Sequence, residues 1–343
     1  MMVYAGSEKT RMRWSMSRRR FVAVAAGAIA AESIPYALGV STDRVRIVTG
    51  LRAGVQSLGW IGMEAGIFRR LGLEIAFPKL ETGGPEAAAG LIRGDWEFAE
   101  TGSSPLVQGV LDGHDTVILL TPTAPSPIGI TVLARQGISE PSQLRGMRIG
   151  VLTETGQTTI SLRVALRTWG VTATLVPLGT FGRIYATLGS GGIDAGALPF
   201  DYRFLGPREF GLNVIEGPSP GFSPAAVGCT RRLITANRSL VARLVQGYVE
   251  TIHFFKTRRA EVVPLLQRFL VFQDRSAVEA AYDFYAPRFQ PMPRPSESAV
   301  QNLLQELALK RPSAGALSPA AVADVSFLDE LERIGFIRKL YAE

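Results

Sequence analysis

The chain has 343 residues, of which 46% are hydrophobic and 20% are charged, so it can bury two cores of ordinary domain size and is not expected to be disordered. Its formal net charge is +7, but six basic residues and only one acidic residue, Glu8, lie in the first 31 positions. The rest is nearly neutral and has no Lys/Arg cluster interleaved with aromatic residues, so no nucleic-acid partner is predicted. Cys229 is the only cysteine, which excludes an intrachain disulfide.

Residues 1–40 are typical of an export signal. Three consecutive arginines at 18–20 precede an uncharged run over 22–31, followed by small residues, which is the pattern of a twin-arginine signal. The run is shorter than the roughly 20 residues that a membrane span needs. We therefore predict an exported, periplasmic protein, and the alternative is a basic N-terminus that stays at a membrane surface uncleaved.

The first part of the chain alternates strands and helices. Each strand is followed by a polar, glycine-bearing loop that opens a helix, and in the last of these loops Ser104 is the expected N-cap, with Pro105 behind it. The expected strands are 45–49, 73–77, 97–99 and 117–120; the expected helices are 58–68, one opened by the loop at 81–86, and one that ends near residue 112.

The same order of elements recurs further along. From Gly72 to Asp95, and again from Gly170 to Asp194, a strand leads to an apolar helix, then a Gly and an Asp, then a short strand. Each copy reads as a βαβ pair, and two copies without tandem regularity predict two α/β lobes. A proline-rich crossing at 122–127 and a return at 217–224 assign residues 41–123 and 226–343 to lobe one and residues 124–225 to lobe two.

The remainder of the chain is predicted to be helical. Apolar residues between Leu240 and Phe255 fall on one helix face, and further helices are expected at 259–270, 275–286, 296–310 and 319–333. This tail is expected to pack on lobe one.

Four polar loops, 52–57, 82–85, 101–104 and 153–159, lie where a strand ends and a helix begins. That edge of an open α/β sheet is where ligands bind, and unpaired amides at helix N-termini can hold an anion without a lysine. Ordinary helix capping is the alternative for any single loop. Arg52 favours an anion whereas Glu154 opposes one, and Asp201 at a strand end is positioned to accept a hydrogen bond, so the charge of the ligand stays open.

Catalytic groups are sparse. The two histidines, His114 and His253, lie in a turn and on a helix, and no metal-ligand spacing or nucleophile elbow is present. We predict no cofactor, no metal and no enzyme activity. Aromatic residues near the proposed edge, Trp60, Phe181, Phe200 and Tyr202, are expected to pack in the core rather than to stack on a ligand.

Four segments carry a resemblance to a known family. They are 64–74, 94–99, 142–151 and 192–195, and in this order they resemble the type II substrate-binding proteins of ABC importers, in the nitrate, sulfonate and taurine group whose relatives bind the pyrimidine precursor of thiamine. The resemblance implies a two-lobed periplasmic-binding-protein fold: two open mixed sheets flanked by helices, a two-strand hinge and a helical C-terminal tail. It also implies a monomer that works with an ABC permease.

By the resemblance, a small polar or anionic ligand lies between the lobes. The second-lobe loop is Thr-Glu-Thr-Gly-Gln-Thr where the family is usually Gly-Ser-rich, which argues against a simple sulfonate or nitrate. An enzyme on the same scaffold, a decarboxylase or pyrimidine synthase using Asp201 or Glu154, and a ligand-presenting sensory protein are the alternatives. The candidate ligand-binding residues from the loops and the resemblance together are Arg52, Gln56, Ser57, Gly83, Gly84, Thr101, Ser103, Ser104, Thr153, Glu154, Thr155, Gly156, Gln157, Thr158 and Asp201.

Overall fold

The structure is a computed structural model that describes residues 42–80, 83–125, 128–270, 272 and 274–342. The predicted export signal lies outside these residues. Within the described residues, ten strands form two five-stranded sheets, each of which mixes parallel and antiparallel pairs. The mixed sheets predicted from the sequence are confirmed.

The first sheet has the strand order β2-β1-β3-β10-β4. β1 pairs in parallel with β2 and β3, whereas β10 runs antiparallel to β3 and β4. The strand nearest the C-terminus is therefore inserted between β3 and β4. The bounds are β1 Asp43–Thr49, β2 Leu73–Ala76, β3 Phe98–Thr101, β4 Thr116–Leu120 and β10 Ala226–Thr230.

The second sheet repeats this arrangement with the order β7-β6-β8-β5-β9. β6 pairs in parallel with β7 and β8, and β5 runs antiparallel to β8 and β9. The two βαβ units found in the sequence thus form equivalent parts of two sheets. The bounds are β5 Ile128–Ala134, β6 Arg148–Val151, β7 Thr174–Pro177, β8 Ala195–Leu198 and β9 Asn213–Pro218.

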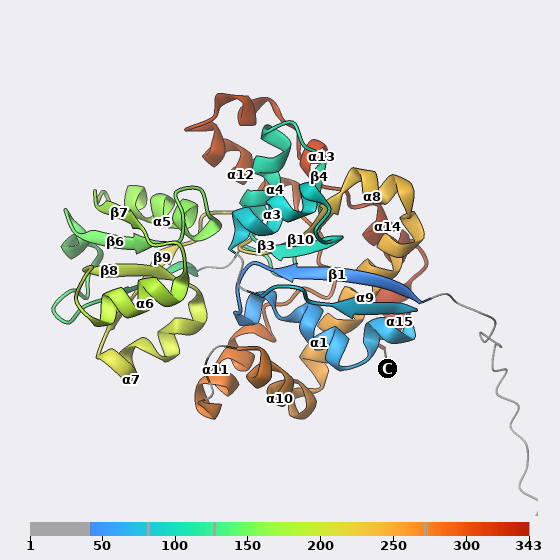
Figure 1. Cartoon of the computed structure of the whole chain (residues 1–343), viewed down its shortest axis with the longest axis horizontal. Helices are drawn as coiled ribbons and strands as arrows, with labels where there is room; N and C mark the ends of the chain where they lie inside the picture. The colour runs from blue at the N-terminus through green and yellow to red at the C-terminus, as the bar shows by residue number, and fades with distance from the viewer. Residues whose placement is uncertain (1–41, 81–82, 126–127, 271, 273, 343) are drawn as a thin grey trace, which may run out of the picture. The chain divides into compact units, whose positions relative to one another are not determined.

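Helices cover both faces of each sheet (Figure 1). Alternation along β1 shows why: Val45 and Ile47 enter the core beneath α1 and α9, whereas Val48 enters the core beneath α3 and α4. On the second sheet, α5 covers one face and α6 the other. The bounds are α1 Leu58–Glu64, α2 Ile67–Arg70, α3 Gly84–Arg93, α4 Ser103–Leu111, α5 Gln157–Thr168, α6 Phe181–Gly189 and α7 Gly206–Phe210, with short 3-10 turns η1 Gly54–Gln56, η2 Pro141–Leu144 and η3 Phe200–Phe204.

Two segments connect the sheets, one from β4 to β5 and the other from β9 to β10. The Ser223 hydroxyl in the second segment donates to the Thr123 carbonyl in the first at 2.9 Å. This is the two-strand connection expected of the fold. We call the first sheet, its helices and the C-terminal region the first half, and the second sheet with its helices the second half. The predicted lobe boundaries and the independent movement of two lobes stay predictions.

The C-terminal region is helical, as predicted. The expected helix at 319–333 is wrong as a single element, because Ala323 is extended (φ −132°) and bridges to Ile118 of β4. The expected helix at 58–68 also breaks, at Gly66 with φ 71°. The bounds are α8 Arg231–Ala236, α9 Arg238–Thr257, α10 Arg259–Phe269, α11 Arg275–Tyr285, α12 Glu297–Ala308, η4 Pro312–Ala316, α13 Pro319–Val322, α14 Ser326–Arg333 and α15 Phe336–Leu340.

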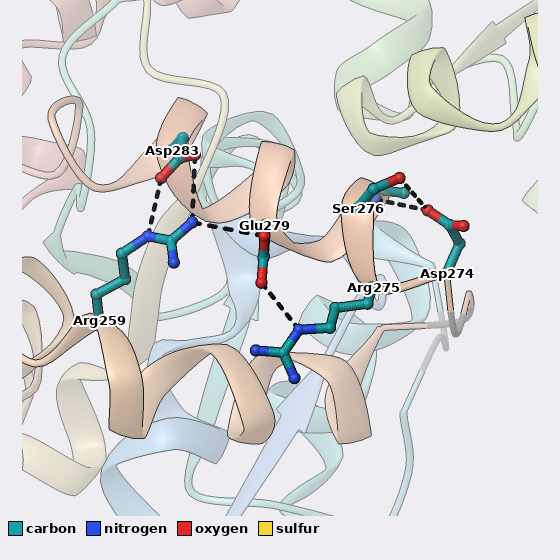
Figure 2. Close-up of polar contacts among 7 residues, drawn as sticks. Arg259, Asp274, Arg275, Ser276, Glu279 and Asp283 are labelled. Carbon is teal, nitrogen blue, oxygen red and sulfur yellow. Dashed lines mark hydrogen bonds and ion pairs between the residues drawn. The ribbon is translucent and has the colours of Figure 1, made fainter.

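Helices α10 and α11 pack as a pair (Figure 2). Arg259 of α10 pairs with Asp283 and Glu279 of α11, and Arg275 pairs with Glu279 at 2.9 Å. Asp274 caps α11 by accepting a hydrogen bond from the Ala277 amide at 2.8 Å. These contacts help to fix the helix whose last turn carries Phe284 and Tyr285.

Candidate functional site

A cavity of about 420 Å³ is lined by residues from both sheets and from the C-terminal region. Its lining includes Gly50 after β1, Thr101 at the end of β3, Leu152 after β6 and Pro199 after β8. These positions are at the carboxyl ends of strands, which is the edge where open α/β sheets bind ligands. The volume is that of pockets that enclose small organic molecules.

The structure brings six of the predicted residues to this cavity and places the other nine elsewhere. The six come from all four predicted loops, three of which lie in the first half and one in the second. Their contact with a ligand stays a prediction. The six lining residues are Gln56, Gly84, Thr101, Gly156, Gln157 and Thr158.

Arg52 does not line the cavity. Its guanidinium donates to the carbonyls of Phe269 at 2.6 Å and Arg268 at 3.2 Å, at the end of α10. A cation is favourable there, because the last carbonyls of a helix are unpaired and partly negative. Arg52 thus serves packing of the C-terminal region, and the anion-attracting role expected of it has no support.

Ser57 and Ser103 are buried and also lie outside the cavity lining. The Ser57 hydroxyl donates to the Gly54 carbonyl at 2.8 Å, and the Ser103 hydroxyl donates to the Ser223 carbonyl at 3.2 Å. Ser104 is not the N-cap of α4, since the helix begins at Ser103 with Gly102 as N-cap. Gly83 is the N-cap of α3, with φ 77°.

The second-half loop divides between the cavity and the surface. Glu154 and Thr155 are exposed, and the Glu154 carbonyl accepts from Arg163 at 2.7 Å. The Thr153 carbonyl accepts from the Thr159 hydroxyl at 2.6 Å. Of the residues in this loop, Gly156, Gln157 and Thr158 line the cavity, and they lie at the start of α5.

The two halves meet beside the cavity through Gln157. Its Oε1 accepts a hydrogen bond from the Ser104 amide at 2.9 Å, so α5 of the second half contacts the start of α4 in the first. The Gln108 side chain adds a bond to the Thr155 carbonyl at 2.9 Å. Gly102 permits this approach, because a Cβ there would lie 2.4 Å from Cβ of Gln157.

Several buried polar atoms on the cavity have no hydrogen-bond partner in the described part of the chain. Such a group costs about 1–3 kcal/mol when it stays unpaired. Thr101, Thr131 and Thr123 are 0%, 2% and 4% exposed. A bound molecule would supply the missing partners. The atoms are the Oγ1 of Thr101, Thr123, Thr131 and Thr158, and Nε2 of Gln157.

Asp201 lies behind the cavity rather than on it. Its carboxylate, 1% exposed, accepts bonds from the Gly54 amide at 3.2 Å and the Tyr285 hydroxyl at 3.0 Å. Burial raises the pKa of Asp201 to about 6, and the two hydrogen bonds oppose this increase. Since Asp201 follows β8 while Gly54 and Tyr285 belong to the other half, this carboxylate links the halves.

Aromatic side chains form one side of the cavity. Phe200 stacks on Phe284 with ring centroids 3.5 Å apart, and Tyr285 lies nearly parallel to Phe289 at 6.0 Å. We call these four residues the aromatic wall. Three of them belong to α11 or to the turn after it. The sequence did not predict these three residues, because no local pattern near residue 284 indicates that the end of α11 lies at the cavity.

The other aromatic predictions divide. Phe181 lies in the core of the second half and Phe200 packs against the core of the first, as expected, and both also line the cavity. Trp60 packs on Phe77 and Phe269, and Tyr202 packs on Tyr185.

Arg288 is the only formally charged residue among the described residues that line the cavity. Its guanidinium carbon lies 3.7 Å from the Phe284 ring centroid, and Nη1 donates to the Phe284 carbonyl at 2.7 Å. Both contacts orient the cation against the aromatic wall. No described group of three or more His, Cys, Asp or Glu side chains has an arrangement that could hold a metal ion. Among the described helices, none combines the length and apolar composition of a membrane span.

Comparisons with known proteins agree with this geometry. Residues 60–203 match the family model described as NMT1/THI5 like. No significant match was found among curated protein sequences. The resemblance stated from the sequence is thus confirmed over residues 60–203.

Solved structures show that the chain has the periplasmic binding protein fold. The alkanesulfonate-binding protein SsuA from Xanthomonas axonopodis pv. citri, bound to MOPS, aligns with TM-score 0.66 and 17% identity over 82% of this chain and 98% of that one. The nitrate-binding protein NrtA from Synechocystis PCC 6803 aligns with TM-score 0.67 and 10% identity over 85% and 88%. A Candida albicans gene product described as having the generic periplasmic binding protein fold aligns with TM-score 0.65 and 16% identity over 84% and 95%.

Proposed function

We propose that this protein is the solute-binding component of an ABC-type importer. In the periplasm it holds a small molecule in the cavity between its two halves, and it delivers this molecule to a permease in the membrane. The observation that carries the proposal is the cavity itself, with unpaired hydroxyls on both β3 and α5. A molecule bonded to both would hold the halves together, which is how ligand-driven closure works. The sulfonate- and nitrate-binding proteins of the same fold support this reading.

The lining also favours binding over catalysis. Neither Asp201 nor Glu154, the acid or base of the alternative enzyme, is among the cavity residues, and no described lining residue is a carboxylate, imidazole or thiol. General acid–base catalysis needs such a group within hydrogen-bond reach of the substrate. A gene for a permease and one for an ATPase beside the coding sequence would favour the importer over a sensory protein.

The test is calorimetric titration of the purified chain with nitrate, taurine, alkanesulfonates, aromatic carboxylates and pyrimidines, combined with small-angle scattering. We expect one of these solutes to bind and to reduce the radius of gyration. Failure of every solute to bind would count against the proposal, and steady turnover of a bound solute would replace it with the enzyme.

A further inference from the structure

We propose that the ligand is an aryl monoanion: a flat aromatic molecule with a single acidic group. This inference rests on the proposed function and narrows the class of solute. It follows from two distinct parts of the cavity lining, the aromatic wall of Phe200, Phe284, Tyr285 and Phe289, and a polar end made of Gly84, Thr101, Gln157 and Thr158.

The aromatic wall suits a flat ring. Phe200 and Phe284 come from different halves and are stacked at an interplanar angle of 17°. Phe284 and Tyr285 meet edge to face at 5.0 Å and 87°. Rings in such clusters prefer further aromatic partners in offset or edge-on contact, beyond the gain from burying apolar surface. A ligand ring in contact with the wall would touch residues of both halves.

The polar end is continuous across the halves, and each of its unpartnered side-chain groups can donate a hydrogen bond. A Cβ on Gly84 would lie 2.9 Å from Oγ1 of Thr101, and the neighbouring Gly102 contacts Gln157. Because Oε1 of Gln157 is occupied by the Ser104 amide, its unpartnered Nε2 is the group left to donate. Thr101, fully buried, adds an unpartnered hydroxyl.

Two helices begin at the same polar end. α3 starts at Gly84 and α5 at Gln157, and the first amides of a helix are unpaired and partly positive. Donors and helix starts together call for an acceptor with negative charge, such as a carboxylate or sulfonate oxygen.

The charge of the lining limits the ligand further. Arg288 supplies one positive charge, and none of the described lining residues is an acid that could pair with an ammonium group. A zwitterion such as taurine would leave its ammonium group without a carboxylate to pair with, which is costly in a partly buried site. Nitrate would satisfy the polar end and leave the aromatic wall without contact.

Calorimetric titration near pH 7 tests this directly with naphthoate, its saturated analogue decahydronaphthoate, naphthamide, taurine and nitrate. We expect naphthoate to bind at least about tenfold more tightly than each of the others. Equal binding of the saturated analogue would overturn the aromatic requirement, and equal binding of naphthamide the anionic one. Tighter binding of taurine or nitrate would overturn the ligand class while the proposed function stands. Binding of none of the five would also overturn the ligand class, and the alkanesulfonates and pyrimidines of the wider panel would then test the proposed function separately.

Paired variants locate the two parts of the ligand. Thr101→Val should weaken naphthoate binding about tenfold by removing a donor to a charged oxygen, and Phe284→Leu should weaken it by a similar factor. The controls are Thr235→Val on α8 and Phe210→Leu at the end of α7, neither of which lines the cavity. Thr158→Val replaces Thr101→Val if the latter fails to fold. Unchanged affinity in the cavity variants would contradict the assignment.

Discussion

The unpaired threonine hydroxyls give a test at the scale of single residues. Thr131 is buried and its hydroxyl has no partner in the described structure, whereas the hydroxyl of Thr159, equally buried, donates to the Thr153 carbonyl. Without ligand, Thr131→Val should raise the free energy of unfolding by about 1 kcal/mol, and Thr159→Val should lower it by about 1 kcal/mol. Urea denaturation measures both. A comparable loss in the two variants would show that Thr131 already has a partner.

Glu100 gives a second residue-scale prediction, through pH. Its buried carboxylate on β3 accepts bonds from the Gly59 amide at 2.7 Å and the Thr49 hydroxyl at 3.2 Å. Burial raises the pKa of Glu100 from 4.5 to about 7. The folded state therefore holds the proton more tightly than the unfolded state, so this group's stabilising contribution is full below about pH 4.5 and is lost as pH rises through about 7.

Glu100→Gln should remove this component. The shift corresponds to about 3 kcal/mol, so the fall in unfolding free energy between pH 4.5 and 8 should be smaller in the variant than in the parent. Denaturant titrations across this range measure it. Glu74→Gln, on the exposed rim of β2, is the matched control and should retain the parent's profile; a Glu100→Gln profile like the parent's would contradict the burial argument.

For single residues, the sequence predicted where the backbone lies better than where the side chain points. Thr101 and Thr158 could be found because residues that follow a strand and open a helix must lie at the carboxyl edge of the sheet. Arg52 could not be resolved in this way, because the carbonyls that hold it belong to a helix more than 200 positions away. Adjacency on the chain fixes where a backbone goes, and only packing decides where a long side chain points.

At the scale of elements, the break between α1 and α2 can be tested with a pair of glycines. Gly66 has φ 71°, and no other atom lies within 4 Å of where its Cβ would be; Gly182 lies inside α6 with the same free space and no positive φ. Gly66→Ala should lower the unfolding free energy by about 1 kcal/mol, through backbone strain alone. Gly182→Ala should raise it by about 0.5–1 kcal/mol. Thermal unfolding compares them, and the same sign for both would refute this account of the break.

Most elements were predictable, because hydrophobic periodicity and glycine positions mark them directly. The two βαβ units appear in the sequence as a repeated order of Gly and Asp, and they form β2 and β3 in the first sheet and β7 and β8 in the second. The helix expected at 319–333 failed because Ala323 pairs with β4, a tertiary contact that local propensity does not record. For the same reason the contribution of α11 to the cavity was invisible.

For the whole molecule, Asp201 predicts that the arrangement of the halves depends on pH. If separation of the halves exposes this carboxylate to water, its pKa falls from about 6 towards 3.8. Protonation then favours the joined state and raises the ratio of joined to separated molecules by up to about 100-fold. This effect is complete below about pH 4 and is lost above about pH 6. The ligand-free protein should therefore open as pH rises.

Small-angle scattering of the ligand-free chain at about pH 4.5 and pH 7 measures this change. We expect a larger radius of gyration at the higher pH for the parent, and no pH dependence for Asp201→Asn. Arg208, which also links the halves by donating to Asp274 at 2.9 Å, provides a control, since Arg208→Gln should retain the parent's pH dependence. A radius that shrinks with rising pH would contradict the sign.

We propose that one solute touches both halves of the molecule at once. Hydrogen–deuterium exchange, measured with and without the solute that binds most tightly in calorimetry, tests it most directly. We predict that bound solute slows exchange both in the first half, around Thr101, and in the second, around Thr158. Protection confined to one half, or lying away from the cavity, would contradict the account.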